Sequence, residues 1–155
     1  MRALLVLLVL SPALAHAKES ACFNSEQSRV SLVTPYKVAP QNTEQRVGVK
    51  FTTKPGLHVY WKNSGDAGYP PVIDWSLSPN LQAAEQRWPA PHRFMQRGNL
   101  ESLGYEGEVI YPFTLRFAAV ADSVKLKADV DHLVREDECV PYRCMSELNL
   151  PTAPT

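Results

Sequence analysis

The stretch that decides the fold class is VIYPFTLRF, at residues 109–117. One set of alternate positions is wholly apolar, whereas the intervening set includes Thr114 and Arg116. A period of two is typical of a β-strand with one buried face. The apolar set consists of Val109, Tyr111, Phe113, Leu115 and Phe117.

The same period recurs on both sides of this stretch. In VKLKADVD, at 124–131, Val124, Leu126, Ala128 and Val130 share one face and charged residues occupy the other. RVGVKF, at 46–51, alternates in the same way. Shorter candidate strands, separated by Gly, Pro, Asn and Asp, lie at 29–34, 57–61, 72–77, 81–87 and 147–150.

These short strands, 13 prolines and the lack of a helical period predict an all-β fold. We expect a single domain built as an immunoglobulin-like antiparallel β-sandwich. Turn-rich segments at 62–71, 88–94 and 103–107 are predicted to be loops. Loops on such a scaffold are where binding surfaces are usually built.

The first seventeen residues resemble an export signal. Arg2 supplies a positive start, residues 3–10 are continuously apolar, and Ala15-His16-Ala17 forms a small-x-small cleavage site. The apolar run is shorter than the roughly 20 residues needed to cross a bilayer. We therefore predict a signal peptide at 1–17 and an exported domain at 18–155 that is not membrane-embedded.

Composition and motifs exclude several other classes. The 16 basic and 16 acidic residues balance, which gives no electrostatic footprint for nucleic acid. The sequence lacks the Gly-x-Ser-x-Gly elbow of hydrolases, a phosphate-binding glycine loop and the HExxH motif of zinc proteases. The chemistry of the chain is therefore expected at its three cysteines.

Cys139 and Cys144 lie five positions apart, and Cys22 lies near the start of the predicted domain. A disulfide needs its Cα atoms about 4.4–6.8 Å apart, so a Cys139–Cys144 bond requires a turn, which we place around Pro141. As a staple this bond would contribute only about 2 kcal/mol, against about 5 kcal/mol for a bond from Cys22 to Cys144. The pairing stays open between Cys139–Cys144, Cys22 with either partner, and free or intermolecular thiols.

Several motifs together resemble the periplasmic N-terminal domain of the DsbD and ScsB thiol:disulfide interchange proteins. The similarity runs from about Ser28 to Leu150, and the motifs follow the family's order. They are HVYWKNSGDAG at 58–68, IDW at 73–75, WPAPHRF at 88–94, GYEGEV at 104–109, HLV at 132–134 and CVP at 139–141.

The resemblance implies an immunoglobulin-like domain that exchanges thiols and disulfides. Its expected partner is a periplasmic thioredoxin-like oxidoreductase or a membrane electron donor. One departure matters, because the ScsB-like pattern has a cysteine where this sequence has Arg135, and Cys139 matches the second family cysteine. Cys144 is an additional thiol on the other side of Cys139.

We predict Cys139 and Cys144 as the catalytic pair. Acidic residues at 136–138 disfavour a thiolate at Cys139, whereas Arg135 and Arg143 favour it. The acidic run is either a solvated turn or a docking surface for a basic partner.

Binding residues are predicted in the loops. The resemblance implies an aromatic cap loop over the active sulfur, for which Tyr69 and Asp66 are candidates. Tyr105 is a third candidate, in the loop predicted at 103–107.

We predict no cofactor and no metal site. Cys139, Cys144 and Met145 are soft ligands that suit Cu(I), but the close double spacing of a zinc site is absent. His132 continues the face of Val124 to Val130 and is expected to be a packed or edge histidine, not a metal ligand.

Two functions remain: a thiol-disulfide exchange module that uses a cysteine pair, or a redox-inactive binding module that keeps the fold and its docking loops. The oligomeric state is left open because one thiol must stay unpaired within the chain.

Overall fold

The computed structural model describes residues 18–135 and 138–153, so the predicted signal peptide lies outside the described residues. The described chain forms strands and no helix. The strands are β1 (Lys18–Asn24), β2 (Ser28–Thr34), β3 (Glu44–Thr53), β4 (His58–Gly65), β5 (Val72–Asp74), β6 (Leu81–Gln86), β7 (His92–Gln96), β8 (Leu100–Glu106), β9 (Glu108–Phe117), β10 (Ser123–Arg135) and β11 (Cys139–Pro151).

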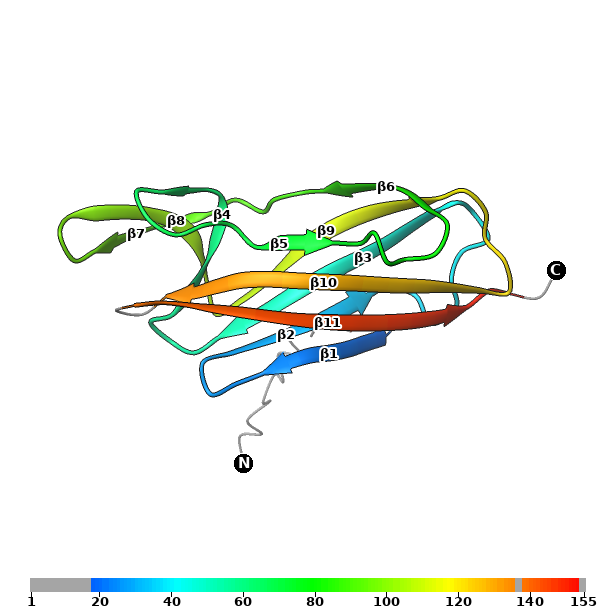
Figure 1. Ribbon diagram of the computed structural model, residues 1–155, viewed down its shortest axis with the longest axis horizontal. Coiled ribbons are helices and arrows are strands. Elements are labelled where there is room, and N and C mark those ends of the chain that lie inside the picture. Colours follow the sequence, from blue (N-terminus) through cyan, green and yellow to red (C-terminus); the bar gives the residue numbers. More distant parts are fainter. Residues whose placement is uncertain (1–17, 136–137, 154–155) are drawn as a thin grey trace, which may run out of the picture.

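Two antiparallel sheets form a sandwich (Figure 1). The first has the order β1-β2-β3-β9-β6, and the second has the order β11-β10-β4-β8-β7, with β5 paired to β10. This architecture confirms the predicted all-β, immunoglobulin-like sandwich. None of the described segments is a helix long and apolar enough to cross a membrane.

The longest ladder joins β10 to β11, from Ser123 opposite Pro151 to Arg135 opposite Cys139. Alternate residues of β10 from Val124 to Val134 are buried, as the period of two predicts. His132 belongs to this face and is fully buried, which confirms that it is packed.

The core fills the space between the sheets. Tyr111 of β9 links the two layers, since its hydroxyl donates a hydrogen bond to the carbonyl of Tyr60 in β4 at 2.8 Å. Its ring meets the ring of Phe51 edge-on, with the centroids 5.2 Å apart. Other fully buried core residues are Val30, Leu32, Val49, Val59, Leu115, Leu126, Val130 and Leu150.

All three segments predicted as loops are partly strands. Residues 103–106 belong to β8 and residues 92–94 to β7, and β4 continues to Gly65. Gly104 is needed in β8 because a Cβ there would lie 2.0 Å from the carbonyl oxygen of Val59. This glycine therefore marks a close approach of two strands, whereas the sequence suggested a turn.

The turn predicted around Pro141 is wrong. Pro141 lies inside β11 and is paired with Leu133 of β10. Since β11 is the outermost strand of its sheet, it has hydrogen-bonding neighbours on one side only. An edge strand tolerates proline, which lacks an N–H.

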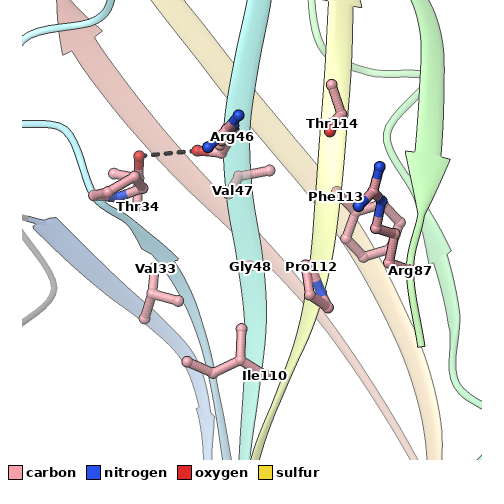
Figure 2. A pocket seen from close by; sticks show the side chains of 11 residues that line it. Val33, Thr34, Arg46, Val47, Gly48, Arg87, Ile110, Pro112, Phe113 and Thr114 are labelled. Atoms are coloured by element: carbon pink, nitrogen blue, oxygen red, sulfur yellow. Dashed lines mark hydrogen bonds between the residues drawn. The ribbon is translucent and has the colours of Figure 1, made fainter. Parts of the chain in front are cut away.

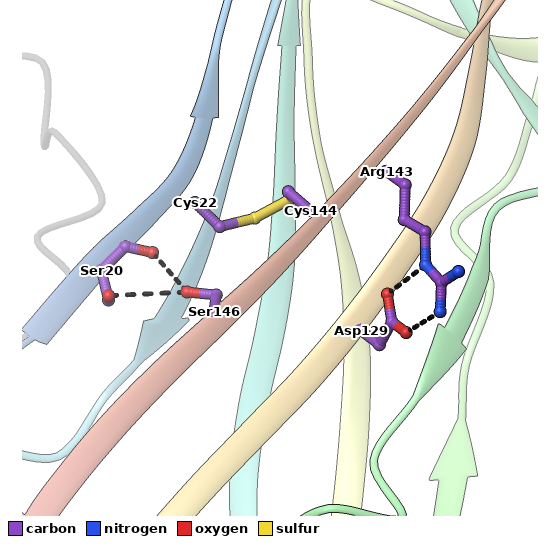
Figure 3. The surroundings of a disulfide bond; sticks show 6 residues. All are labelled: Ser20, Cys22, Asp129, Arg143, Cys144 and Ser146. Carbon is purple, nitrogen blue, oxygen red and sulfur yellow. Dashed lines mark hydrogen bonds and ion pairs between the residues drawn. A yellow bond between two sulfur atoms is a disulfide. The ribbon is translucent and has the colours of Figure 1, made fainter.

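A disulfide between Cys22 and Cys144 links β1 to β11, with the Cα atoms 5.8 Å apart. The bond joins an edge strand of one sheet to an edge strand of the other. Figure 3 shows it beside a hydrogen bond from the Ser146 hydroxyl to the Ser20 carbonyl, at 3.2 Å. These contacts close one open side of the sandwich.

Loss of this disulfide is expected to weaken the fold substantially. The bond spans a separation of 122 residues, so replacing Cys22 and Cys144 by Ser together should lower the free energy of unfolding by about 2–5 kcal/mol. Urea denaturation measures the change. Cys139→Ser is the matched control and should leave stability nearly unchanged, because Cys139 is free and exposed. If the unmodified protein, the double variant and Cys139→Ser are equally stable, the disulfide does not stabilise the fold.

Candidate functional site

Cys139 and Cys144 lie on opposite faces of β11. Residues five apart in a strand differ by an odd number of steps, so their side chains point to opposite sides of the sheet. Cys144 faces inward and is bonded to Cys22, while Cys139 is exposed and free. Of the pairings that the sequence left open, the structure has Cys22–Cys144, so Cys139 and Cys144 do not form a bonded pair.

Cys139 sits at the start of β11, directly opposite Arg135 at the end of β10. The Nη1 atom of Arg135 donates a hydrogen bond to the Cys139 sulfur at 3.5 Å. Glu136 and Asp137, which form most of the predicted acidic run, lie outside the described residues, and Glu138 is exposed. Among the described neighbours, the sulfur thus has a positive group in direct contact.

Tyr60 of β4 provides a second contact, with its hydroxyl oxygen 3.7 Å from the Cys139 sulfur. Its side chain is fully buried. Burial, together with the hydrogen bond and charge of Cys139, raises the pKa of Tyr60 to about 12. The phenol therefore keeps its proton at neutral pH and can donate it to the sulfur.

His58 lies behind Tyr60 and pairs with Arg135 in the sheet register. Burial, followed by the positive charge of Arg135, lowers the pKa of His58 to about 4, so the ring is neutral at pH 7. It stacks on Phe94 at 4.4 Å and meets Tyr60 edge-on at 5.1 Å. Its Nε2 lies 3.2 Å from the Ser102 hydroxyl. The ring of Tyr60 is thus held from one side.

The segment after β4 holds Tyr60 from another side. Gly68 has φ of +83°, and a Cβ on it would lie 2.2 Å from the ring of Tyr60. Next to it, the Tyr69 hydroxyl donates a hydrogen bond to Asp131 of β10 at 3.2 Å. Tyr69 is 38% exposed. Burial, then the negative charges of Asp131 and Cys139, raise the pKa of Tyr69.

Of the predicted binding residues, Tyr69 is the one whose pKa responds to the charge of Cys139. Asp66 instead anchors the loop to β8, since its carboxylate accepts a hydrogen bond from the Glu101 backbone N–H at 2.8 Å. Tyr105 is buried in the core, where its hydroxyl donates to the Pro89 carbonyl at 2.7 Å. The roles of all three in binding a partner stay predictions.

The described residues contain no group of three or more His, Cys, Asp and Glu side chains placed to hold a metal ion. His58 and His132 are buried, and burial is the main cause that lowers the pKa of each to about 4. Cys144, one of the soft ligands considered for Cu(I), is engaged in the disulfide.

The sequence matches the family model of the N-terminal domain of thiol:disulfide interchange protein DsbD over residues 29–149. The chain belongs to this DsbD N-terminal domain family. The match begins after β1, so Cys22 lies before it, whereas Cys139 and Cys144 lie within it. None of the curated proteins matches the sequence.

Two solved structures are similar to this chain. The N-terminal periplasmic domain of ScsB from Proteus mirabilis is 22% identical, with a TM-score of 0.68. The alignment covers 90% of this chain and 54% of that chain, so this chain spans about half of its length. The DsbD N-terminal domain of Neisseria meningitidis in the reduced form is 14% identical, with a TM-score of 0.40, and the alignment covers 94% and 92% of the two chains.

The sequence analysis did not identify Tyr60 or His58 as site residues. Both occur in the HVYWKNSGDAG motif, and that motif was the only available signal. Their proximity to Cys139 arises because β4 pairs with the end of β10. Arg135, noted as a substitution for a cysteine, occupies the position directly across the hairpin from Cys139.

A substitution at Gly68 is expected to disturb the site. Gly68→Ala places a methyl group against the Tyr60 ring, which pushes the Tyr60 hydroxyl away from the sulfur. Because the thiolate then loses a hydrogen-bond donor, the alkylation rate of Cys139 should fall about tenfold. Iodoacetamide labelling followed by mass spectrometry measures this rate. Gly56→Ala is the matched control, because Gly56 has φ of +84° but no neighbouring atoms within 4 Å of a Cβ. If both variants react like the unmodified protein, Gly68 does not position Tyr60.

Proposed function

We propose that this chain is a periplasmic thiol-disulfide exchange module in which Cys139 forms a mixed disulfide with a partner protein. The observation that carries the proposal is an exposed, unbonded thiol in contact with a guanidinium and a protonated phenol. A positive group and a hydrogen-bond donor both attract the negative charge of a thiolate, which is the nucleophile in exchange. Membership of a thiol:disulfide interchange family supports the same chemistry.

The proposed reaction has two steps. The Cys139 thiolate attacks one sulfur of a partner disulfide, a new S–S bond forms, and the second partner sulfur leaves as a thiolate. In the second step a thiol of a further molecule attacks the partner sulfur of the mixed disulfide, forms a new S–S bond there and releases Cys139 as a thiolate. Attack by the partner's own second thiolate only reverses the first step. The cysteine pair that exchanges is therefore shared between two proteins, with one sulfur from each.

Cys144 takes a different role in this proposal from the catalytic one predicted for it. Bonded to Cys22 and facing the core, it serves to tether β1. A chain with one exchanging thiol cannot resolve its own mixed disulfide. When Cys139 is held in a mixed disulfide, a partner dithiol can reduce it, because one partner thiolate attacks that bond and the second then closes the partner's own disulfide. A thioredoxin-like oxidoreductase, whose site carries two cysteines, suits this requirement.

The periplasmic location rests on two observations. The similar ScsB structure is a periplasmic domain, and the first seventeen residues have the composition of an export signal. A stable disulfide also fits an oxidising compartment.

A redox-inactive binding module is the second candidate. Arg135 favours it, because a charged side chain stands where the ScsB-like pattern has a cysteine. In that case Cys139→Ser would bind the partner without covalent chemistry and with undiminished affinity.

A trapping experiment tests the exchange proposal. The probe is a thioredoxin-like protein whose second active-site cysteine is replaced by Ser and whose first carries thionitrobenzoate as a leaving group. Attack by Cys139 should release thionitrobenzoate and form a one-to-one covalent complex, faster than glutathione reacts with the same probe. Arg135→Gln should slow this reaction about tenfold, since a hydrogen bond to a charged group contributes roughly 1.5 kcal/mol.

Two variants locate the reacting sulfur. Replacing Cys22 and Cys144 by Ser together should leave complex formation intact, whereas Cys139→Ser should abolish it. A rate equal to that of glutathione, or complex formation by Cys139→Ser, would refute the proposal. Tight binding without a covalent bond would support the second candidate.

A cysteine at position 135 is expected to form a bond with Cys139. Directly opposed residues of an antiparallel pair have Cα atoms about 4.5–5.5 Å apart, which lies within the disulfide range. Arg135→Cys should therefore lose its free thiol under oxidising conditions and gain a reducible bond, as counted by thiol titration. Lys127→Cys, opposite Glu147 on the same strands, is the control and should gain one thiol instead. A retained free Cys139 in Arg135→Cys would contradict the register.

A further inference from the structure

The outer face of the first sheet contains an apolar row that crosses three strands. Val33 of β2 pairs with Gly48 of β3, and Gly48 pairs with Pro112 of β9. The solvent-facing side of an antiparallel sheet is normally polar. Gly48 carries no side chain, and neighbouring apolar side chains fill the space above it.

The side chains of Val33 and Ile110 cover Gly48. A Cβ on Gly48 would lie 2.4 Å from Ile110 and 3.1 Å from Val33, which shows that both side chains lean over the glycine. The resulting groove has a volume of about 550 Å³. Ligand sites usually measure about 300–1,000 Å³, so the groove is large enough for a small molecule.

Arginines border the groove on two elements. Arg46 lies on β3, and Arg87 follows β6, where its backbone N–H donates to the Pro112 carbonyl at 2.8 Å. Figure 2 shows Arg46 on β3, between Thr34 and Thr114, and Arg87 beside Phe113, beyond β9. The lining also includes the hydroxyls of Thr34 and Thr114 but no acidic residue.

The charges of the arginines are poorly neutralised. Arg87 meets Glu85 at 3.9 Å, and both side chains are largely exposed, so this pair contributes little. Arg46 makes no ion pair with a residue that the structure describes. An anion in the groove would therefore find unused guanidinium donors beside an apolar floor.

We propose that this groove binds a small amphipathic anion, an apolar molecule that carries one carboxylate. The apolar part lies along Ile110 and Pro112, which are half-buried and exposed, respectively, and the carboxylate accepts hydrogen bonds from Arg46 or Arg87. The site is on the first sheet, whereas Cys139 is on the second, so it is separate from the thiol chemistry. The proposal goes beyond the exchange function and does not rest on it.

The test titrates the ¹⁵N-labelled protein with decanoate below its critical micelle concentration. Amide resonances of Gly48 and Thr114 should shift and saturate. Acetate, which has the charge without the chain, and decyltrimethylammonium, which has the chain with the opposite charge, should shift them far less. Cys139→Ser should bind decanoate normally, which separates this result from the outcome of the trapping experiment.

Variants test the arginines directly. Arg46→Gln combined with Arg87→Gln should weaken decanoate binding about tenfold, as expected for the loss of a charge-assisted hydrogen bond. Arg116→Gln is the matched control and should bind like the unmodified protein, because Arg116 lies on β9 outside the groove and pairs with Glu44 at 3.2 Å. All three are exposed residues whose loss should preserve the fold.

Three results would overturn the proposal. One is the absence of saturable shifts at Gly48 and Thr114, and another is equal binding of decanoate and decyltrimethylammonium. The third is that the unmodified protein is a dimer without ligand and that the protein with both Arg46→Gln and Arg87→Gln is a monomer. The groove would then be an interface between copies of the chain.

Discussion

The structure depends on the long antiparallel ladder between β10 and β11. Its register fixes which residues of β11 face the core and which face outward. This alternation determines which cysteine is buried and bonded and which is exposed. Cys144 falls on the inner face and meets Cys22, whereas Cys139 falls on the outer face beside Arg135. Two sulfurs that are close in sequence are therefore assigned to different tasks by the pleat of a single strand.

Much of the fold could be predicted from the period of the apolar residues. The alternation at 109–117 and 124–131 identified β9 and β10, and it also placed His132 in the interior. The strands β7 and β8 were missed because neither HRFMQ nor LESLGYE alternates clearly. Pro141 was predicted in a turn because proline has no backbone N–H and cannot hydrogen-bond to strands on both sides. An edge strand has a neighbouring strand on one side only, and the sequence alone did not show that β11 is an edge strand.

The site was less accessible to sequence reasoning than the fold. Cys139 could be named because a thiol is chemically conspicuous, and Arg135 because it departs from a family pattern. Tyr60 and His58 have no such signature, since aromatic residues in a strand usually belong to the core. Their function as neighbours of the sulfur depends on the pairing of β4 with the end of β10 and on Gly68 lying against the ring.

The disulfide also has a consequence for the order in which the chain matures. Cys22 lies near the beginning of the described chain and its partner near the end, and every other described strand lies between β1 and β11. During synthesis or vectorial transport from the N-terminus, the bond cannot close until β11 has emerged. Oxidation of this pair therefore reports completion of the whole domain, and a chain stopped before residue 144 is left with Cys22 unpaired and β1 untethered.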